Sequence, residues 1–329
     1  MATNRFWLFR QRNALAVAWI DRALSRPGGD PALRADCLVI KSWALWPLGR
    51  HDEQCDVMEE ADALTATLPG TPSRAGVLRT RAVQETWNRR LDLASAFADQ
   101  ADTCARATGD PWQIAVAAYA KALVAGDRRE LRARVELAAS LLQQVEDIHH
   151  PADMFKIAGY RAFSNGDDDD AVEYVTRAVA MTRELDDPHQ WMLVQGMAGM
   201  VALLTDDIAG ATAAFREQLE LARELVVLPA AFEGLRGLTA VAVREGDLDR
   251  AARLSGAAEA HRYGQLEHPA DIRVCDTFIA PARTRHGTEA WDTAAGAGAA
   301  LGFSDAIAYA LREAEGKAVA VPMPSVVRH

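Results

Sequence analysis

Hydrophobic residues fill half of the 329 positions of this chain, but they do not alternate one by one with polar residues. Alanine is abundant, whereas valine, isoleucine, threonine and tyrosine form no alternating runs. Strict alternation is typical of a half-buried strand, and alanine is the residue most favourable to a helix interior. The pattern therefore predicts an all-α protein.

Short polar turns interrupt the hydrophobic segments at intervals close to 40 residues. Seven turn residues form this series: Gly49, Arg89, Gly126, Gly166, Asp206, Gly246 and Gly287. A second series runs in step with them at intervals of 37 to 41 residues: Pro31, Pro72, Pro111, Pro151, Pro188, Pro229 and Pro269. A fixed repeat of this length is typical of proteins built from stacked helical hairpins.

The prolines are expected to open helices, because proline at the first turn of a helix loses no hydrogen bond. An aspartate directly precedes three of them, as Asp30, Asp110 and Asp187. Its carboxylate can accept a hydrogen bond from the free N–H groups of the first turn. Each period then predicts one helix that starts at its proline, a turn, and a second helix.

Small residues recur at three fixed distances from the turns. Seven positions before a turn lie Ser42, Ala82, Tyr119, Gly159, Gly199 and Thr239. Five positions after it lie Gln54, Ala94, Leu131, Ala171, Ala211 and Ala251. Twelve positions after it lie Ala61, Ala101, Ala138, Ala178, Gln218 and Ala258. Small side chains there would let the two helices of a hairpin, and the next hairpin, approach closely.

This spacing resembles the tetratricopeptide repeat (TPR), although Tyr119, Leu131, Gln54 and Gln218 depart from its small-residue positions and its period is about 34 residues. The resemblance implies a right-handed α-solenoid of about seven helical hairpins and a terminal helix over 304–315. It assigns residues 1–316 to one repeat domain, whose first unit over 6–25 is the most degenerate. Residues 317–329 are expected to be a linker or tail.

A narrower resemblance concerns both ends of the chain, with the stretches RFWLFRQRNALAVAWIDRAL, GLRGLTAVAVREGDLDRAARLSGAAEAHR and EAWDTAAGAGAALGFSDAIAYAL. They look like the C-terminal repeat region of large actinobacterial-type transcriptional regulators, of the antibiotic-regulator and large LuxR types. In those families an ATPase module precedes the repeats and a helix-turn-helix module lies at one end. This chain has no GxxxxGKS or GxxxxGKT phosphate loop and no basic recognition helix, so such modules would adjoin it. We expect an excised sensor domain or a free-standing relative.

The chain has 36 basic and 46 acidic residues and a net charge of −10. An acidic protein repels phosphate backbones, so we expect no direct contact with nucleic acid. The four cysteines form no CxxC pair and are predicted to be reduced, mostly buried thiols. The N-terminal apolar segment is too short for a membrane span and lacks the layout of a signal peptide. We therefore expect no membrane contact and a cytoplasmic location.

Three motifs suggest chemistry. The aspartates at 167–170 suit either a divalent cation or the first turn of a helix, and the second is favoured because no oxygen ligands follow at set positions. The stretch GAGAALG at 296–302 lacks the spacing of a dinucleotide site and indicates close helix packing or a helix end. His149 and His150 have no suitably spaced partner for a metal. We expect no cofactor, no metal and no enzymatic activity.

The TPR resemblance also selects side chains that would face a concave groove, at fixed positions of the first helix of each hairpin. They are Trp43, Trp46, Arg79, Trp87, Lys156, Tyr160, Phe163, Met200, Glu233, Arg236 and Arg244. Aromatic residues with a few cations suit an apolar ligand that carries an anionic group, or a peptide with an acidic tail. Alternatively, the tryptophans fill the core between repeats.

These observations together predict a non-enzymatic ligand-sensing and protein-interaction domain of a bacterial transcriptional regulator. It would bind a small metabolite or a partner segment in the groove, and binding would alter the pitch of the repeat array. The alternative is a constitutive protein–protein scaffold that has no small-molecule ligand.

Overall fold

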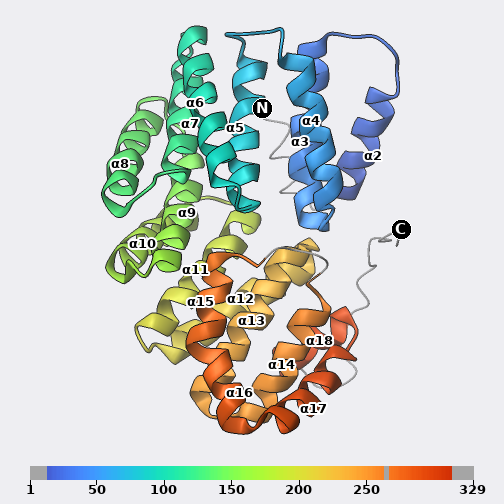
Figure 1. Ribbon diagram of the computed structural model, residues 1–329, viewed down its shortest axis with the longest axis vertical. Coiled ribbons are helices and arrows are strands. Elements are labelled where there is room, and N and C mark those ends of the chain that lie inside the picture. Colours follow the sequence, from blue (N-terminus) through green and yellow to red (C-terminus); the bar gives the residue numbers. More distant parts are fainter. Residues whose placement is uncertain (1–12, 263–266, 313–329) are drawn as a thin grey trace. The chain divides into compact units, whose positions relative to one another are not determined.

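The computed structural model describes residues 13–262 and 267–312, and these residues form helices without any strand (Figure 1). The predicted all-α fold of seven hairpins is confirmed. The first helices are α3 (Pro31–Leu45), α5 (Pro72–Trp87), α7 (Pro111–Leu123), α9 (His150–Asn165), α11 (Pro188–Leu204), α13 (Leu228–Glu245) and the continuous segment α15 (Pro269–Val274), η2 (Cys275–Ile279) and α16 (Ala280–His286). The second helices are α4 (His51–Thr65), α6 (Leu91–Thr108), α8 (Arg128–Gln144), α10 (Asp168–Arg183), α12 (Ile208–Leu225), α14 (Leu248–Ala260) and α17 (Thr288–Ala299). The remaining elements are α2 (Asn13–Leu24), the short 3-10 helix η1 (Trp46–Leu48) and α18 (Phe303–Ala310).

The prolines lie at the starts of the first helices, and the turn residues lie just before the second helices, as the sequence predicts. Each proline of the series is the first or second residue of a first helix. Asp30, Asp110 and Asp187 cap these helices, and each carboxylate accepts a backbone N–H of the first turn at 2.9 to 3.0 Å. Gly166 and Gly246 turn the chain with φ angles of 82° and 80°, a region that glycine enters without strain.

The chain divides into two compact units. Unit 1 comprises residues 1–158 and 180–185, and unit 2 comprises residues 159–179 and 186–329. The repeat region that the sequence assigns to a single domain over 1–316 thus contains two units. The predicted tail over 317–329, and the part of the predicted first unit before residue 13, lie outside the described residues.

In unit 1 each hairpin packs against the next through both of its helices. Helix α4 contacts α5 and α6 contacts α7, while the first helices α3, α5 and α7 contact one another in order. Three of the small residues predicted at helix crossings, Ala61, Ala101 and Ala138, are fully buried. The distance between helix axes depends on the side chains at the crossing, so these alanines let neighbouring hairpins share one apolar core.

In unit 2, α11 pairs with α12 and α13 with α14, and α17 of the last hairpin packs against α14. The predicted terminal helix is α18, which ends at Ala310 and contacts α12, α13 and α14. Residues 313–315, which the prediction includes in this helix, lie outside the described residues. Helix α18 therefore touches two successive hairpins.

The stretch GAGAALG combines a close helix crossing with a helix end, as the sequence indicates. Helix α17 ends at Ala299. Gly298 lies against the backbone of Arg253 in α14, and Gly256 of α14 lies against Ala295 in α17. A Cβ atom at Gly298 or Gly256 would lie 1.8 Å or 1.9 Å from a carbonyl oxygen of the facing helix. The two backbones are in direct contact, and only glycine fits at these two positions.

The first helix of the last hairpin contains a π-helical segment that the sequence analysis did not predict. It spans Cys275–Ile279, and the N–H of Ala280 donates to the carbonyl oxygen of Cys275, five residues earlier. Pro281 follows directly. A proline ring inside an α-helix clashes with the carbonyl group four residues earlier. The wider π turn accommodates the proline without ending the helix.

The aspartate run begins α10, as predicted. Asp168 forms an ion pair with Arg273 at 2.7 Å. Asp170 is buried, whereas Asp168 and Asp169 are exposed, so only part of the run faces solvent. Within the ranges that the structure describes, no three His, Cys, Asp or Glu side chains gather in a way that could hold a metal ion.

The four cysteines are free thiols. Cys104 is buried, whereas Cys37, Cys55 and Cys275 are half-buried, so the expectation of mostly buried thiols is wrong for three of them. Burial raises the pKa of the Cys37 and Cys275 thiols above their ordinary value. Both thiols therefore stay protonated at neutral pH.

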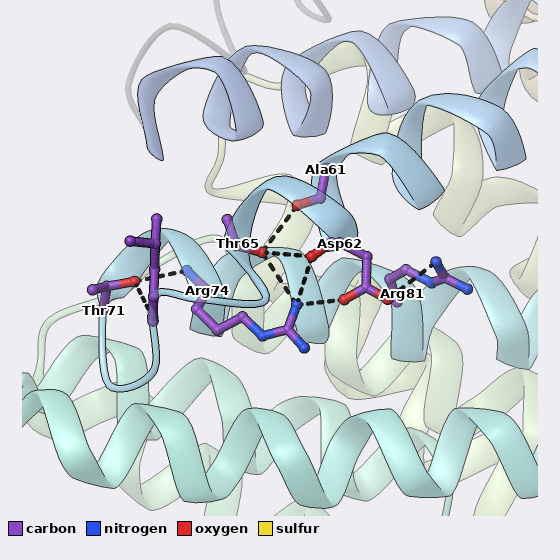
Figure 2. A network of polar contacts seen from close by, with 7 residues as sticks. Ala61, Asp62, Thr65, Thr71, Arg74 and Arg81 are labelled. Carbon is purple, nitrogen blue, oxygen red and sulfur yellow. Dashed lines mark hydrogen bonds and ion pairs between the residues drawn. The ribbon is translucent and has the colours of Figure 1, made fainter. Parts of the chain in front are cut away.

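A polar clamp joins two successive hairpins of unit 1 (Figure 2). Arg74 of α5 reaches the last turn of α4, where it donates to the Asp62 carboxylate, to the Asp62 carbonyl oxygen at 3.1 Å and to the Thr65 hydroxyl at 3.2 Å. Arg81 of α5 lies 3.5 Å from the second carboxylate oxygen of Asp62. One partly buried carboxylate thus holds two arginines of the next hairpin.

Replacing Asp62 by Asn is expected to lower the free energy of unfolding by about 1 to 3 kcal/mol, because the largely buried Arg74 guanidinium loses its carboxylate partner and Arg81 keeps only Glu85, at 3.7 Å. The matched control is Asp102→Asn in α6, which breaks an exposed ion pair with Arg106 and should cost at most about 0.5 kcal/mol. Urea denaturation of the two variants measures the difference. Equal losses would show that the clamp contributes no more than a surface pair.

Candidate functional site

The predicted groove residues are divided between the two units. Unit 1 contains Trp43, Trp46, Arg79, Trp87 and Lys156, and unit 2 contains Tyr160, Phe163, Met200, Glu233, Arg236 and Arg244. In each unit, some of these residues join a cluster of charged side chains on the first helices. The two clusters differ in how completely their polar atoms are paired.

The three tryptophans of unit 1 lie on neighbouring elements. Trp43 is in α3, Trp46 in η1 and Trp87 at the end of α5, and α3 packs against α5. All three side chains are half-buried. Each indole therefore has one part in the protein interior and another part in contact with solvent.

The polar cluster of unit 1 centres on Asp153 in α9. One carboxylate oxygen accepts from the Tyr119 hydroxyl at 2.5 Å and the other accepts from Lys156 Nζ at 2.6 Å. The pKa of Asp153 lies below its ordinary value. Burial acts to raise it, but the charge and hydrogen bond of Lys156 and the hydrogen bond of Tyr119 outweigh burial. Burial and Asp153 raise the pKa of Tyr119 well above its ordinary value, against the nearby charge of Arg79. The tyrosine is thus a fixed donor and the carboxylate a fixed acceptor.

A second carboxylate, Asp147, extends this cluster to the link between α8 and α9. It accepts from Trp112 Nε1 at 2.9 Å and contacts His150 Nδ1 at 2.7 Å. The pKa of Asp147 lies well below its ordinary value. Burial acts to raise it, but the hydrogen bonds and charge of His150 and the hydrogen bond of Trp112 outweigh burial. His150 therefore serves as a partner of Asp147. Asp147 lies in the link before α9, and its Oδ1 accepts the backbone N–H groups of His149 and His150 at 3.0 Å and 2.9 Å. An aspartate shortly before a helix start is the sequence signal that would have indicated this arrangement.

The polar cluster of unit 2 brings together three predicted residues, Tyr160 from α9 and Glu233 and Arg236 from α13. Arg236 is only 5% exposed, ion-pairs with Glu267 at 2.6 Å and with Glu259, and lies 4.6 Å from the ring centre of Phe232. Glu233 accepts from Gln218 Nε2 at 3.0 Å. The single arginine of the cluster is therefore already held by two carboxylates.

Asp271 of α15 is the member of this cluster that the sequence analysis missed. Its side chain is 3% exposed, and its Oδ2 accepts the backbone N–H of His268 at 3.3 Å. Its Oδ1 is buried and has no hydrogen-bond partner among the described residues. Burial raises the pKa of Asp271 to about 6, against the lowering effect of Arg236. Burial and the Asp271 and Glu233 carboxylates also raise the pKa of Tyr160 well above its ordinary value.

Three further predicted residues lie outside the polar cluster of unit 2, which we call the Asp271 cluster. Phe163 is fully buried, with the guanidinium of Arg273 4.6 Å from its ring centre. Met200 of α11 is also buried. Arg244 lies in the last turn of α13, where it is exposed and ion-pairs with Asp206. The first two contribute to packing in unit 2, and the third contributes to its surface.

Three of the four predicted groove cations have a carboxylate partner, namely Lys156 with Asp153, Arg236 with Glu259 and Glu267, and Arg244 with Asp206. The structure therefore differs from the expectation that these cations are available to an anionic group. The polar cluster of unit 2 contains more negative than positive groups, because the carboxylates of Glu233, Glu259, Glu267 and Asp271 surround the single guanidinium of Arg236. Such a cluster suits a positively charged group.

The fold and these clusters define an all-α helical-repeat protein with charged clusters on its first helices. Neither a scan against protein-family models nor a search of curated proteins gives a match to this chain. Across residues 13–262 and 267–312, no helix is both long and apolar enough to cross a membrane. The function of the protein is therefore inferred from the chemistry of the clusters.

Proposed function

We propose that this chain is a non-enzymatic ligand-sensing domain of a bacterial, cytoplasmic transcriptional regulator, and that it binds a small cationic metabolite at the Asp271 cluster of unit 2. The regulatory role is an extension of the resemblance to the repeat region of large transcriptional regulators. The ligand class comes from the charges of the cluster.

The observation that carries the proposal is the buried Oδ1 of Asp271, which lacks a donor among the described residues. A buried polar atom without a hydrogen bond costs about 1 to 3 kcal/mol, so a ligand that supplies a donor is favoured. A protonated amine supplies both a donor and the positive charge that the surrounding carboxylates favour. Tyr160 adds an aromatic ring beside the cluster, which suits an organic cation.

A bound cation would act through the helices that carry the cluster. Tyr160, Arg236 and Asp271 come from α9, α13 and α15, which belong to three different hairpins. A ligand that binds one arrangement of these helices more tightly than another shifts the population of the two arrangements. In a repeat protein such shifts are shared among neighbouring repeats, which gives an adjoining module a change to sense.

Thermal melting with defined probes tests the proposal. Putrescine, agmatine and n-butylamine are expected to raise the melting temperature at pH 7.5, whereas butyrate, of opposite charge, leaves it unchanged. A ligand at 100 times its Kd stabilises a fold by about 2.7 kcal/mol, which is a readable shift. Asp271→Asn should abolish the shift, and Asp276→Asn, an exposed carboxylate on the same segment, should keep it.

Equal shifts in Asp271→Asn and in the parent protein would contradict the assignment to this cluster. An absence of any shift across amines would favour the alternative of a constitutive protein–protein scaffold. Binding of a basic peptide but not of free amines would identify the ligand as a partner segment, since a lysine side chain carries the same ammonium group.

A further inference from the structure

A cavity of about 320 Å³, open to solvent on one side, lies in unit 2 beside α14, α17 and α18. Its polar lining consists of three arginines, one tyrosine and two aspartates: Arg250, Arg253, Arg312, Tyr309, Asp247 and Asp249. Cavities of this size hold small organic molecules. None of these side chains belongs to the Asp271 cluster, so the cavity is a separate feature of the unit.

Arg250 is fixed in the wall of the cavity by the end of α18. It donates to the carbonyl oxygens of Tyr309 at 3.3 Å and of Ala310 at 2.8 Å. Burial lowers the pKa of Arg250, and the charge of Arg312 lowers it further. Arg312 therefore adds to the positive charge around Arg250, and the nearby Tyr309, Asp247 and Glu245 act in the opposite direction.

Arg253 is the cation of the cavity that is available for a ligand. Its guanidinium carbon lies 5.2 Å from the ring centre of Tyr309, as does that of Arg250. Arg253 is exposed and has no hydrogen bond or ion pair from its side chain to any described residue. A guanidinium offers five N–H donors in a planar fork that matches carboxylate and phosphate groups.

Neither aspartate of the lining forms an ion pair with Arg253, although both place negative charge in the cavity wall. Asp247 caps α14, where its carboxylate accepts the backbone N–H of Arg250 at 3.2 Å. Asp249 lies 3.1 Å from Nε2 of His286. Arg312 has an exposed side chain, and Glu245 is its partner at 3.2 Å. No carboxylate among the described residues is therefore paired with Arg253.

We propose that this cavity binds the oxyanion group, a carboxylate or a phosphate, of a small organic anion. Arg253 is its ligand, while Arg250, held by the end of α18, and Arg312, paired with Glu245, add positive charge beside it. Tyr309 and the methyl groups of Ala294 and Ala297 contact the apolar part of the molecule. The site is independent of the cation site at Asp271, and each can exist without the other.

Isothermal titration of the full chain tests the proposal with three probes at constant ionic strength. Inorganic phosphate tests the phosphate group, benzoate tests the carboxylate group, and benzyl alcohol is the uncharged match of benzoate. We expect saturable one-to-one binding of at least one anion and none of benzyl alcohol. The anion that binds more tightly identifies the oxyanion class. Absence of saturable binding by both anions overturns the proposal.

Variants locate the site. Arg253→Gln is expected to weaken anion binding at least tenfold, whereas Arg285→Gln, an exposed arginine of α16 with the same charge change, should alter it less than twofold. Ala297→Glu places a negative charge in the lining without touching an arginine and should also abolish binding. Unchanged affinity in both cavity variants, or an equal loss in Arg285→Gln, overturns the proposal, because binding would then lie elsewhere or be non-specific.

Discussion

Replacing Gly298 or Gly256 by alanine is expected to destabilise the last hairpin of unit 2 by about 3 kcal/mol or more. The added methyl group would lie 1.8 Å or 1.9 Å from a carbonyl oxygen of the facing helix, a distance that no rotamer change can relieve. Overpacking in a tight core typically costs about 1 to 3 kcal/mol, and here the obstacle is backbone on both sides. Helices α14 and α17 would have to separate, and α18, which packs on α14, would lose part of its support.

Gly296 supplies the matched control within the same helix. A Cβ atom there meets no heavy atom within 4 Å, so Gly296→Ala should be neutral or stabilising by up to about 1 kcal/mol through its better helix propensity. Circular dichroism during urea denaturation compares the three variants. If Gly298→Ala and Gly256→Ala unfold at the same urea concentration as Gly296→Ala, the close crossing of α14 and α17 is wrong.

The second large effect is a dependence of stability on pH that arises from Asp271. Its pKa is about 6 in the folded protein and 3.8 ordinarily, so between these values the folded state keeps a proton that the unfolded state releases. The contribution of Asp271 to the free energy of unfolding is therefore greatest below about pH 4, and it is lost as the pH rises through 6. Because of this group, the free energy of unfolding is expected to be about 3 kcal/mol lower at pH 8 than at pH 4.

Asp271→Asn is accordingly expected to be more stable than the parent protein at pH 8 by about 2 to 3 kcal/mol, and to lose this advantage towards pH 4. Thermal and urea unfolding of both proteins from pH 4 to pH 8 measures the difference directly. Asp276→Asn provides the comparison with an exposed carboxylate on the same segment. A constant offset between Asp271→Asn and the parent across this range would show that Asp271 has an ordinary pKa.

A carboxylate that lowers stability at neutral pH is typical of a binding site rather than of a packing position. The same substitution separates the two roles. It should raise stability at pH 8 and abolish amine binding, whereas a purely structural Asp271 would alter only the first of these quantities.

The boundaries of the helices were predictable because their signals are local. Proline at a first turn and aspartate at an N-cap act within a few residues, and the turn residues recur at a fixed period. The small residues at the crossings also follow that period, so the hairpins and their order could be predicted from the sequence. The division into two units is not encoded in such local signals, since prolines and turns continue through it unchanged.

The composition of the clusters was predictable only in part. Tyr160, Glu233 and Arg236 follow from the repeat positions, but Asp271 lies 35 residues from Arg236 on another hairpin. Whether their side chains meet depends on how the helices cross, which no local pattern specifies. Considered without their partners, the cations indicate an anionic ligand at the groove positions. Their carboxylate neighbours reverse that conclusion in unit 2.

The π segment has a local cause that sequence patterns do not reveal. Pro281 at that position ordinarily predicts a helix end or a kink. The chain instead adds one residue to the turn before it, and the helix continues to His286. The choice between these outcomes depends on the packing of η2 against α13, which is a tertiary contact.

The attachment of α18 has a consequence for the order in which unit 2 forms. Most contacts in a repeat protein join neighbours in sequence and therefore form early. Arg216 of α12, however, donates to the carbonyl oxygen of Leu311 at 2.6 Å, across 95 residues of chain. Closing so long a loop is entropically costly and slow compared with pairing adjacent helices. During synthesis the hairpins of unit 2 must therefore persist with the faces that receive α18 uncovered, until residues 303–312 have left the ribosome and can dock.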